Sequence, residues 1–181
     1  MPDVVVTVPK QVWLDWLDEG DLPGDPPMGE EWGFSTWGPE PDIKAGERVY
    51  IVAYGRLRGY APLVAVEEQC SLRPSVGCLL RQGGAVAATI DRPIRGFQGF
   101  RYRDWDRSKE QPFPDWRSAG VPADVAAQIA AYLPSASART MTTGGSALGP
   151  SAPRRHRYAA VSQISRASAS VYRPACEVRS V

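Results

Sequence analysis

The residues best suited to bind an anionic ligand lie between positions 91 and 106, in the sequence DRPIRGFQGFRYRDWD. In an extended strand Arg101 and Arg103 share one face with Trp105, because side chains alternate across a strand. Arginines beside aromatic rings can hold phosphates and stack on bases. The same pattern is typical of an edge strand whose arginines lie over aromatic rings for solubility and packing, so both interpretations stay open. The candidate contacts in this stretch are Arg95, Arg101, Tyr102 and Arg103, interleaved with Phe97, Phe100 and Trp105.

A predicted β-hairpin between positions 44 and 68 must position the remaining candidates. Residues 48–54 (RVYIVAY) are rich in β-branched and aromatic residues, which favours a strand. Residues 60–66 are the return strand, and Pro62 confines it to an edge or a bulge. The intervening GRLRG forms the reversal or a bulge, because glycine adopts positive φ without strain. The candidate nucleic-acid contacts at this hairpin are Arg56, Arg58 and Tyr60.

Charge is distributed unevenly along the chain, although the net charge is only +1. Residues 1–47 hold eleven acidic and two basic residues, which is −9, whereas residues 48–109 hold eleven basic and five acidic residues, which is +6. Residues 134–181 hold seven arginines and one glutamate, again +6. A charged surface usually serves only solvation, but a basic strand-rich segment is also what an anionic partner would use.

The acidic residues gather in a long Pro- and Gly-rich loop, residues 21–42, which also carries three aromatics. A loop of this length inside a compact domain is usually functional or disordered. Trp32, Phe34 and Trp37 argue against disorder, because aromatic side chains bury a large area. We expect them either to cover the end of a barrel or to wall a pocket, where they could stack on a ligand. The loop also supports an alternative function, a protein-interaction module.

The rest of the chain predicts a small α+β fold, a mixed β-barrel with two short helices. Residues 4–8 form a buried strand, and residues 10–19 a helix ending at Gly20. A second helix is expected over residues 122–133, with Pro122 in its first turn and Pro134 as its end. Residues 1–133 therefore form one domain. The basic, Ser/Ala-rich residues 134–181 are expected to be a disordered tail.

Several classes of site lack the residues they need. The chain has no Gly-x-Ser-x-Gly, P-loop or His-Glu-x-x-His motif, and its single histidine, His156, lies in the predicted tail. Three cysteines at unrelated spacings, Cys70, Cys78 and Cys176, predict neither a disulfide framework nor a zinc site. We expect no cofactor and no metal. No apolar run reaches the roughly 20 residues of a membrane helix, and no signal peptide is evident, so a cytoplasmic location without membrane attachment is expected.

Two segments of the hairpin carry a resemblance to a known family. Gly46-Glu47-Arg48-Val49-Tyr50-Ile51 and Arg58-Gly59-Tyr60-Ala61-Pro62-Leu63-Val64, after a strand, a short helix and a Pro/Gly loop, resemble the PUA-like superfamily, especially its ASCH and EVE branches. The resemblance covers about residues 3–106. It implies a small mixed pseudo-barrel that binds RNA or modified nucleotides in a cleft beside the first helix.

One departure from the family concerns catalysis. ASCH proteins carry Gly-x-Lys-x-x-Glu-x-Arg after the first helix, and some use its Lys and Glu for amide hydrolysis. The corresponding segment here, GDLPGD at residues 20–25, has no lysine and no Glu or Arg at those spacings, so the general acid/base pair is missing. A residual hydrolase using Asp21, Asp25 or Glu47 is the third hypothesis. The sequence thus favours non-catalytic binding of a nucleic acid or nucleotide, with RNA as the favoured partner.

Overall fold

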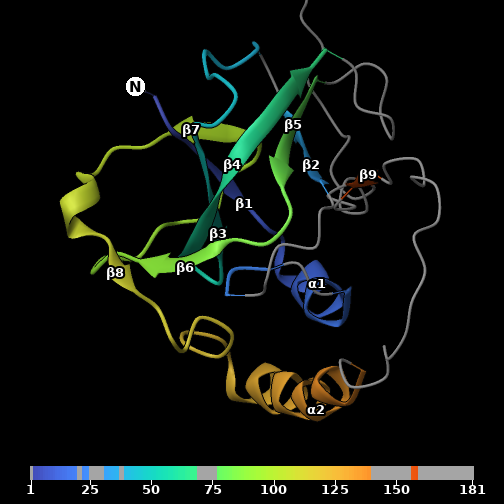
Figure 1. Cartoon of the computed structure of the whole chain (residues 1–181). Coiled ribbons are helices and arrows are strands. Elements are labelled where there is room, and N and C mark those ends of the chain that lie inside the picture. Colours follow the sequence, from blue (N-terminus) through green and yellow to red (C-terminus); the bar gives the residue numbers. More distant parts are fainter. Residues whose placement is uncertain are drawn as a thin grey trace, which may run out of the picture.

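The computed structural model describes residues 2–19, 22–24, 31–36, 39–68, 77–139 and 156–158. Its strands form a mixed sheet that curls into a half-barrel, in the order β7-β1-β3-β4-β5-β2-β9, while β6 bridges β4 and β8 (Figure 1). The strands are β1 (Val4–Thr7), β2 (Glu31–Thr36), β3 (Arg48–Ala53), β4 (Arg56–Glu67), β5 (Gly77–Gln82), β6 (Val86–Thr89), β7 (Phe100–Tyr102), β8 (Gln111–Pro112) and β9 (His156–Tyr158). The helices are α1 (Trp13–Glu19) and α2 (Ala123–Arg139), with 3₁₀ turns η1 (Lys10–Val12) and η2 (Arg107–Lys109). This confirms a small α+β fold.

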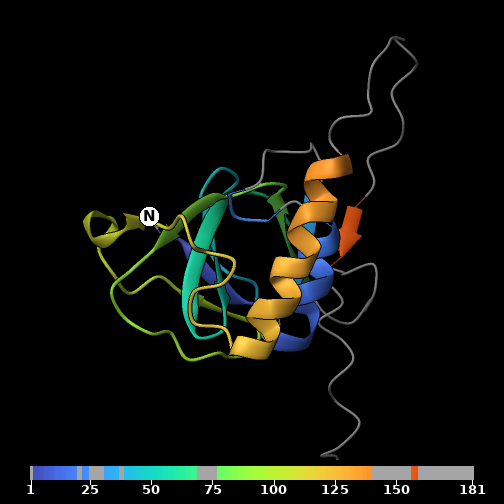
Figure 2. The same ribbon diagram turned by 90° about the horizontal axis from the view of Figure 1, so that it is seen from below.

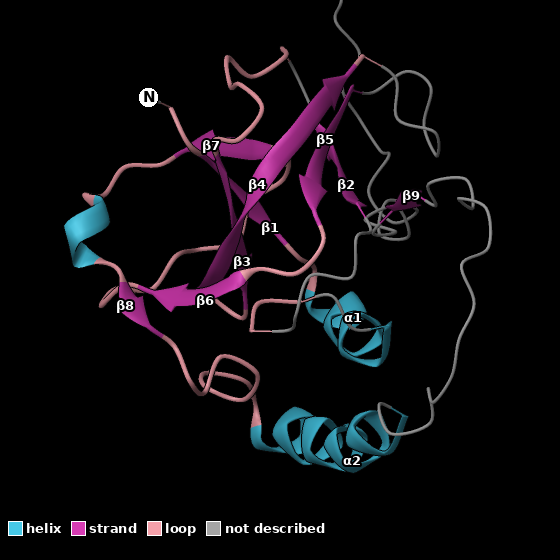
Figure 3. Ribbon diagram, in the orientation of Figure 1, coloured by secondary structure: helices cyan, strands magenta, loops and turns pink. Residues whose placement is uncertain are grey.

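The parallel pair β1 and β3 is buried on both faces, as the continuous apolar runs of both strands require. Val4, Val6 and Ile51 point into the larger core, which α1 and α2 cover. Helix α1 contributes Trp13 and Trp16 to this core. On the opposite face a second core, which includes Val5, Tyr50, Val52, Leu57, Ile90 and Trp105, is covered by residues 90–110. Figure 3 shows both helices on one side of the sheet and the long β6–β8 connection on the other.

The central hairpin turns at the first glycine of the predicted GRLRG segment, and the last glycine of that segment lies at a bulge. Ala53 pairs with Arg56, so the turn is Tyr54-Gly55, and both residues have positive φ (50° and 71°) as in the tight turns that match strand twist. Ile51 pairs with Gly59 and Val52 with Leu57, which leaves Arg58 as the extra residue of a bulge. Gly59 is required there, because a Cβ would lie 2.3 Å from the Val86 carbonyl oxygen of β6.

Helix α2 extends past the end expected from the sequence. It continues through Pro134 to Arg139 and packs beside α1 (Figure 2). The surrounding alanines favour helix and offset part of the roughly 3 kcal/mol that a proline in a helix interior costs. Residues 156–158 pair in parallel with β2 as β9, so this short part of the predicted tail is a strand. The other residues beyond 139 lie outside the described part of the chain. No helix in the described part combines the length and apolarity needed to span a bilayer.

Candidate functional site

An open pocket of about 370 Å³ lies where the edge strand β7 meets the loop that precedes it. We call it the β7 pocket; it is lined by Val5, Arg92, Pro93, Ile94, Arg95, Phe97, Arg101, Tyr102, Asp104 and Trp105. Two backbone contacts hold the loop here, from Ile94 N to the Gly55 carbonyl oxygen (2.7 Å) and from Phe97 N to Thr7 Oγ1 (3.5 Å). Ile94 and Phe97 pack onto the second core. The loop that supplies most of the lining is therefore attached to the sheet.

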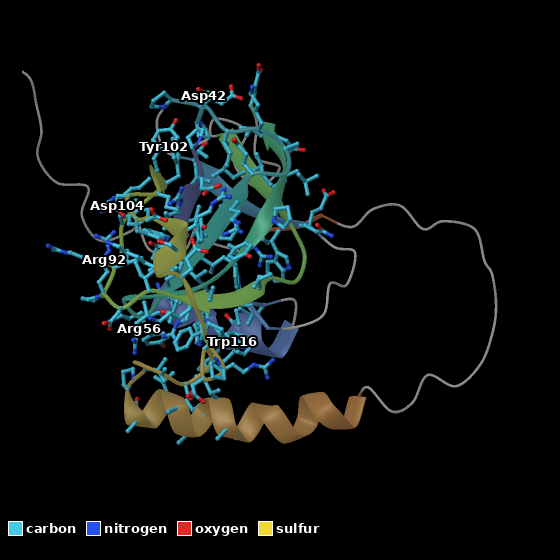
Figure 4. All side chains as sticks on the ribbon, turned by 60° about the vertical axis from the view of Figure 1, so that its left-hand side comes forward. Asp42, Arg56, Arg92, Tyr102, Asp104 and Trp116 are labelled. Carbon is cyan, nitrogen blue, oxygen red and sulfur yellow. The ribbon has the colours of Figure 1, made fainter. Side chains whose placement is uncertain are left out.

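Three arginines from this stretch reach the β7 pocket. Arg101 is exposed, and its guanidinium carbon lies 4.2 Å from the ring centroid of Phe97. Arg95 is also exposed, and Arg92 forms an ion pair with Asp104. The lining thus carries three positive charges and one negative charge. Figure 4 shows Arg92, Asp104 and Tyr102 following one another along this side of the molecule.

Tyr102 forms the rim of the pocket. Its side chain is 47% exposed, and its hydroxyl oxygen accepts a hydrogen bond from Asp42 N at 2.9 Å. The ring stands edge-on to Phe100, with centroids 5.8 Å apart. The ring is therefore held in place and partly exposed, on the opposite face of β7 from Arg101. Its exposed part at the rim suits stacking on a planar ligand.

Arg103 has a structural role that the sequence pattern did not reveal. Its Nε donates to Asp3 Oδ2 at 2.8 Å, and its Nη1 donates to the Trp105 carbonyl oxygen. Asp3 is fully buried; burial alone would raise its pKa, but hydrogen bonds from Arg107, the Arg48 backbone and Arg103 outweigh this and lower the pKa. Arg103 therefore anchors the chain after β7 to Asp3, which directly precedes β1. It is not one of the side chains that we expect to contact a ligand.

Arg58 does not lie on the surface, so the prediction that it contacts a ligand is wrong. The side chain is fully buried; its Nε donates to the Ala53 carbonyl oxygen and its Nη1 to the Trp116 carbonyl oxygen. The guanidinium lies 5.4 Å from the Trp13 ring centroid, and burial lowers its pKa to about 10. The bulge beside Gly59 places this residue under α1, which no local pattern in the sequence indicates.

Arg56 and Tyr60 lie apart from the β7 pocket. Arg56 sits over Phe113, 5.6 Å from its ring centroid, toward Trp116 and α2 (Figure 4). Tyr60 lines a second open hollow of about 380 Å³, the β6 hollow, together with Arg48, Val86, Ala87, Ala88, Arg107, Glu110, Gln111 and Pro112. The expected contacts therefore do not converge in one pocket. The β7 pocket unites only Arg95, Arg101 and Tyr102.

Glu110 is the residue of the β6 hollow that sequence reasoning missed. Its carboxylate accepts hydrogen bonds from Tyr50 Oη (2.5 Å), Arg48 Nη1 (2.9 Å) and Trp105 Nε1 (3.2 Å). Burial and the hydrogen bond to Glu110 raise the pKa of Tyr50 to about 12. These contacts fix Arg48 with its guanidinium carbon 3.9 Å from the Tyr60 ring centroid. No sequence signal pointed to Glu110, because its partners are more than 50 residues away except Trp105.

The aromatics of the acidic loop do not form a ligand surface where they are described. Trp32 and Phe34 are 1% and 3% exposed and pack on Trp16, with centroids 4.7 and 5.7 Å apart. They belong to the larger core, as expected if they cover the barrel, and the alternative in which they stack on a ligand is wrong. Trp37 lies outside the described residues.

The remaining candidates add no chemistry to the β7 pocket. Glu47 is buried and its Oε2 accepts from Lys44 N at 2.7 Å, which shapes the turn before β3. Asp21, Asp25, Cys70 and Cys176 fall outside the described part of the chain. Within that part, no group of three His, Cys, Asp or Glu side chains could hold a metal ion.

No family model, curated protein or solved structure matches this chain. The resemblance to the PUA-like superfamily and its ASCH and EVE branches therefore stays a hypothesis.

Proposed function

We propose that this protein binds a nucleic acid or a nucleotide through the β7 pocket. The observation that carries the proposal is the presence of Arg95, Arg101 and Tyr102 in the lining of one hollow, whose loop is hydrogen-bonded to β1 and to the turn of the central hairpin. Phosphate contacts from arginine supply affinity, and stacking on an exposed ring accepts any base. Two arginines and one tyrosine can therefore bind the phosphates and a base of a single strand or of a nucleotide.

Each side chain has a distinct part in the binding. Arg101 is already stacked on Phe97, so its guanidinium is held in place and less side-chain entropy is lost when a phosphate binds. Its outer face remains available to a base, because guanidinium planes stack on bases as aromatic rings do. Arg95 supplies a second phosphate contact, and Tyr102 supplies the stacking surface.

Oligonucleotide titrations at several salt concentrations test the proposal. We expect Arg101→Gln and Arg95→Gln each to lower the dependence of log K on log salt by about 0.7 on a single strand, since each lost phosphate contact releases one counterion fewer. Lys10→Gln is the matched control, because it removes one exposed charge next to α1, outside the β7 pocket. Circular dichroism confirms that each variant is folded.

Three outcomes would contradict the proposal. Absence of binding at low salt in the wild type removes the nucleic-acid function and favours the protein-interaction module. Loss of binding in Lys10→Gln but not in the pocket variants moves the site to the first helix, where the family resemblance implies a cleft. Loss of binding only in the Arg154→Gln/Arg155→Gln double variant of the full chain moves it to the basic C-terminal segment.

A further inference from the structure

A single cross-strand row connects the β7 pocket to the β6 hollow. Arg101 pairs with Val5, Val5 with Tyr50, Tyr50 with Tyr60, and Tyr60 with Val86. Residues paired across a sheet have side chains on the same face, so these five side chains form one line across β7, β1, β3, β4 and β6. Strands are spaced about 4.8 Å apart, which places Arg101 and Tyr60, three strands apart, about 14 Å from each other.

The middle of this row is covered and its two ends are open. Trp105 packs on Tyr50, with ring centroids 5.1 Å apart, and Val5 is only 2% exposed. Arg101 lines the β7 pocket at one end of the row, and Tyr60 lines the β6 hollow at the other end. A ligand that reaches both ends must therefore pass over Trp105, which covers the middle.

A third hollow shares lining residues with both ends. This central hollow, about 680 Å³, is lined by Arg103, Asp104, Trp105, Asp106 and Arg107. It shares Asp104 and Trp105 with the β7 pocket, and it shares Arg107 with the β6 hollow. The three hollows are thus neighbours on the surface. The two aspartates have partners, since Asp104 pairs with Arg92 and Asp106 accepts from Ser108 N.

The two ends repeat the same arrangement. Arg101 lies over Phe97 at 4.2 Å in one, and Arg48 lies over Tyr60 at 3.9 Å in the other. Glu110 holds Arg48 in place, and Arg107, whose side chain is 47% exposed, adds a cation between the ends. Each end therefore offers an ordered guanidinium on an aromatic ring, a unit that can bind a phosphate by its edge and a base by its face.

We infer that the ligand is a single nucleic-acid strand that spans both ends, rather than one nucleotide held in the β7 pocket. The inference rests on the proposed function and specifies its ligand. A stacked strand advances about 3.4 Å per nucleotide, so the separation of about 14 Å spans about four steps between about five nucleotides, and fewer when the strand is extended. The β7 pocket holds one end of the strand, and Arg48 with Tyr60 holds the other.

Calorimetric titration with a length series tests this inference. The probes are uridine 5′-monophosphate and oligouridylates of two, four and eight nucleotides, each measured on the full chain. We expect affinity to rise steeply up to about five nucleotides and then to level off. An eight-nucleotide strand offers a one-nucleotide site eight equivalent positions, which alone would raise the affinity roughly eightfold over the mononucleotide. The measured rise must exceed this factor if a second contact exists.

Variants of the far end separate the inference from the proposed function. Tyr60→Leu should weaken the eight-nucleotide strand about 5- to 150-fold, the range for loss of one stacked base, with little change for the mononucleotide. Tyr60→Phe keeps the ring and should retain most of the affinity for the longer strand. Arg101→Gln should weaken both ligands.

The outcomes are distinguishable. Mononucleotide binding that equals binding of the eight-nucleotide strand, or an equal effect of Tyr60→Leu on both ligands, would overturn the inference and leave the proposed function standing. Absence of binding by every probe would overturn both. The wild-type length series decides the matter by itself if Tyr60→Leu proves unfolded.

Discussion

Arg58 and Arg101 make similar local contacts in two different regions of the molecule. Both guanidinium groups lie over an aromatic ring, Trp13 for Arg58 and Phe97 for Arg101. Arg58 is sealed beneath α1 and donates to two carbonyl oxygens, whereas Arg101 stays exposed on the edge strand β7. An arginine among aromatics can therefore belong to a core or to a binding surface, and what covers that side of the sheet decides between them.

The largest expected effect comes from removing the buried member of this pair. Arg58→Ala should lower the free energy of unfolding by about 3–5 kcal/mol, because it leaves a cavity and two buried carbonyl oxygens without donors. Urea denaturation followed by circular dichroism measures the loss. Arg101→Ala, the matched surface change, should alter stability by less than about 0.5 kcal/mol. Equal effects of the two substitutions would remove the distinction between the regions.

A second prediction concerns the buried carboxylate that anchors the covering segment. Asp3→Asn should lower stability by about 2–4 kcal/mol, because Arg103 and Arg107 lose the charge they bind. The pKa of Asp3 is lowered from 3.8 in the folded state, so the stabilisation is complete above the unfolded pKa and is lost as pH falls through the folded value. Denaturation midpoints measured from pH 6 to pH 2 should show a smaller acid-dependent decrease in Asp3→Asn than in the wild type. An unchanged pH profile would count against this anchor.

A third prediction concerns the floor of the β6 hollow. Tyr50→Phe should lower stability by about 1–2 kcal/mol near neutral pH, because it removes the hydrogen bond to Glu110. The folded pKa of Tyr50 is raised to about 12 from 10.0. The unfolded chain therefore ionises first, and the contribution of Tyr50 is lost as pH rises from about 10 to 12. Ultraviolet titration of tyrosinate at 295 nm in wild type and Tyr50→Phe isolates this group; a late-titrating tyrosine that persists in the variant contradicts the assignment.

The smallest expected effect lies at the ion pair on the rim. Asp104 and Arg92 are 68% and 46% exposed as side chains, and exposed pairs contribute about 0–1 kcal/mol. Asp104→Asn should therefore change stability by less than about 0.5 kcal/mol. It should raise oligonucleotide affinity about two- to fivefold at low salt, since one negative charge beside the phosphates is removed and screening limits the gain. Weaker binding in Asp104→Asn would show that the carboxylate contacts the ligand or orients Arg92.

The secondary structure of the first half of the chain was largely predictable. The β-branched run at Val4–Thr7, the first helix and the two strands of the central hairpin all form close to their expected positions. Trp13 and Trp16 lie in the core, as their helical spacing indicates. The end of α2 was not predictable from Pro134, because the helix continues through this proline into an alanine-containing segment.

The candidate site was predictable only as a stretch of sequence. Residues 91–106 were identified from composition, and Arg95, Arg101 and Tyr102 do line one pocket. Arg103 lies only two residues after Arg101 and has the same position in the alternation of a strand. It is nevertheless bound to Asp3, 100 residues earlier in the chain. Arg48 and Glu110 acquire their roles from contacts with each other and with Tyr50 and Tyr60 across different strands.

Local sequence therefore determined where strands, turns and the first helix form, because β-branched runs, glycines with positive φ and amphipathic spacing act over a few residues. Tertiary structure alone decided which arginines stay in water. Burial of a side chain depends on which distant segment covers its face, and the free energy of burying a guanidinium depends on partners that no neighbouring residue supplies. Arg58 is part of the core beside Trp13 of α1, and Arg101 is exposed on the edge strand β7.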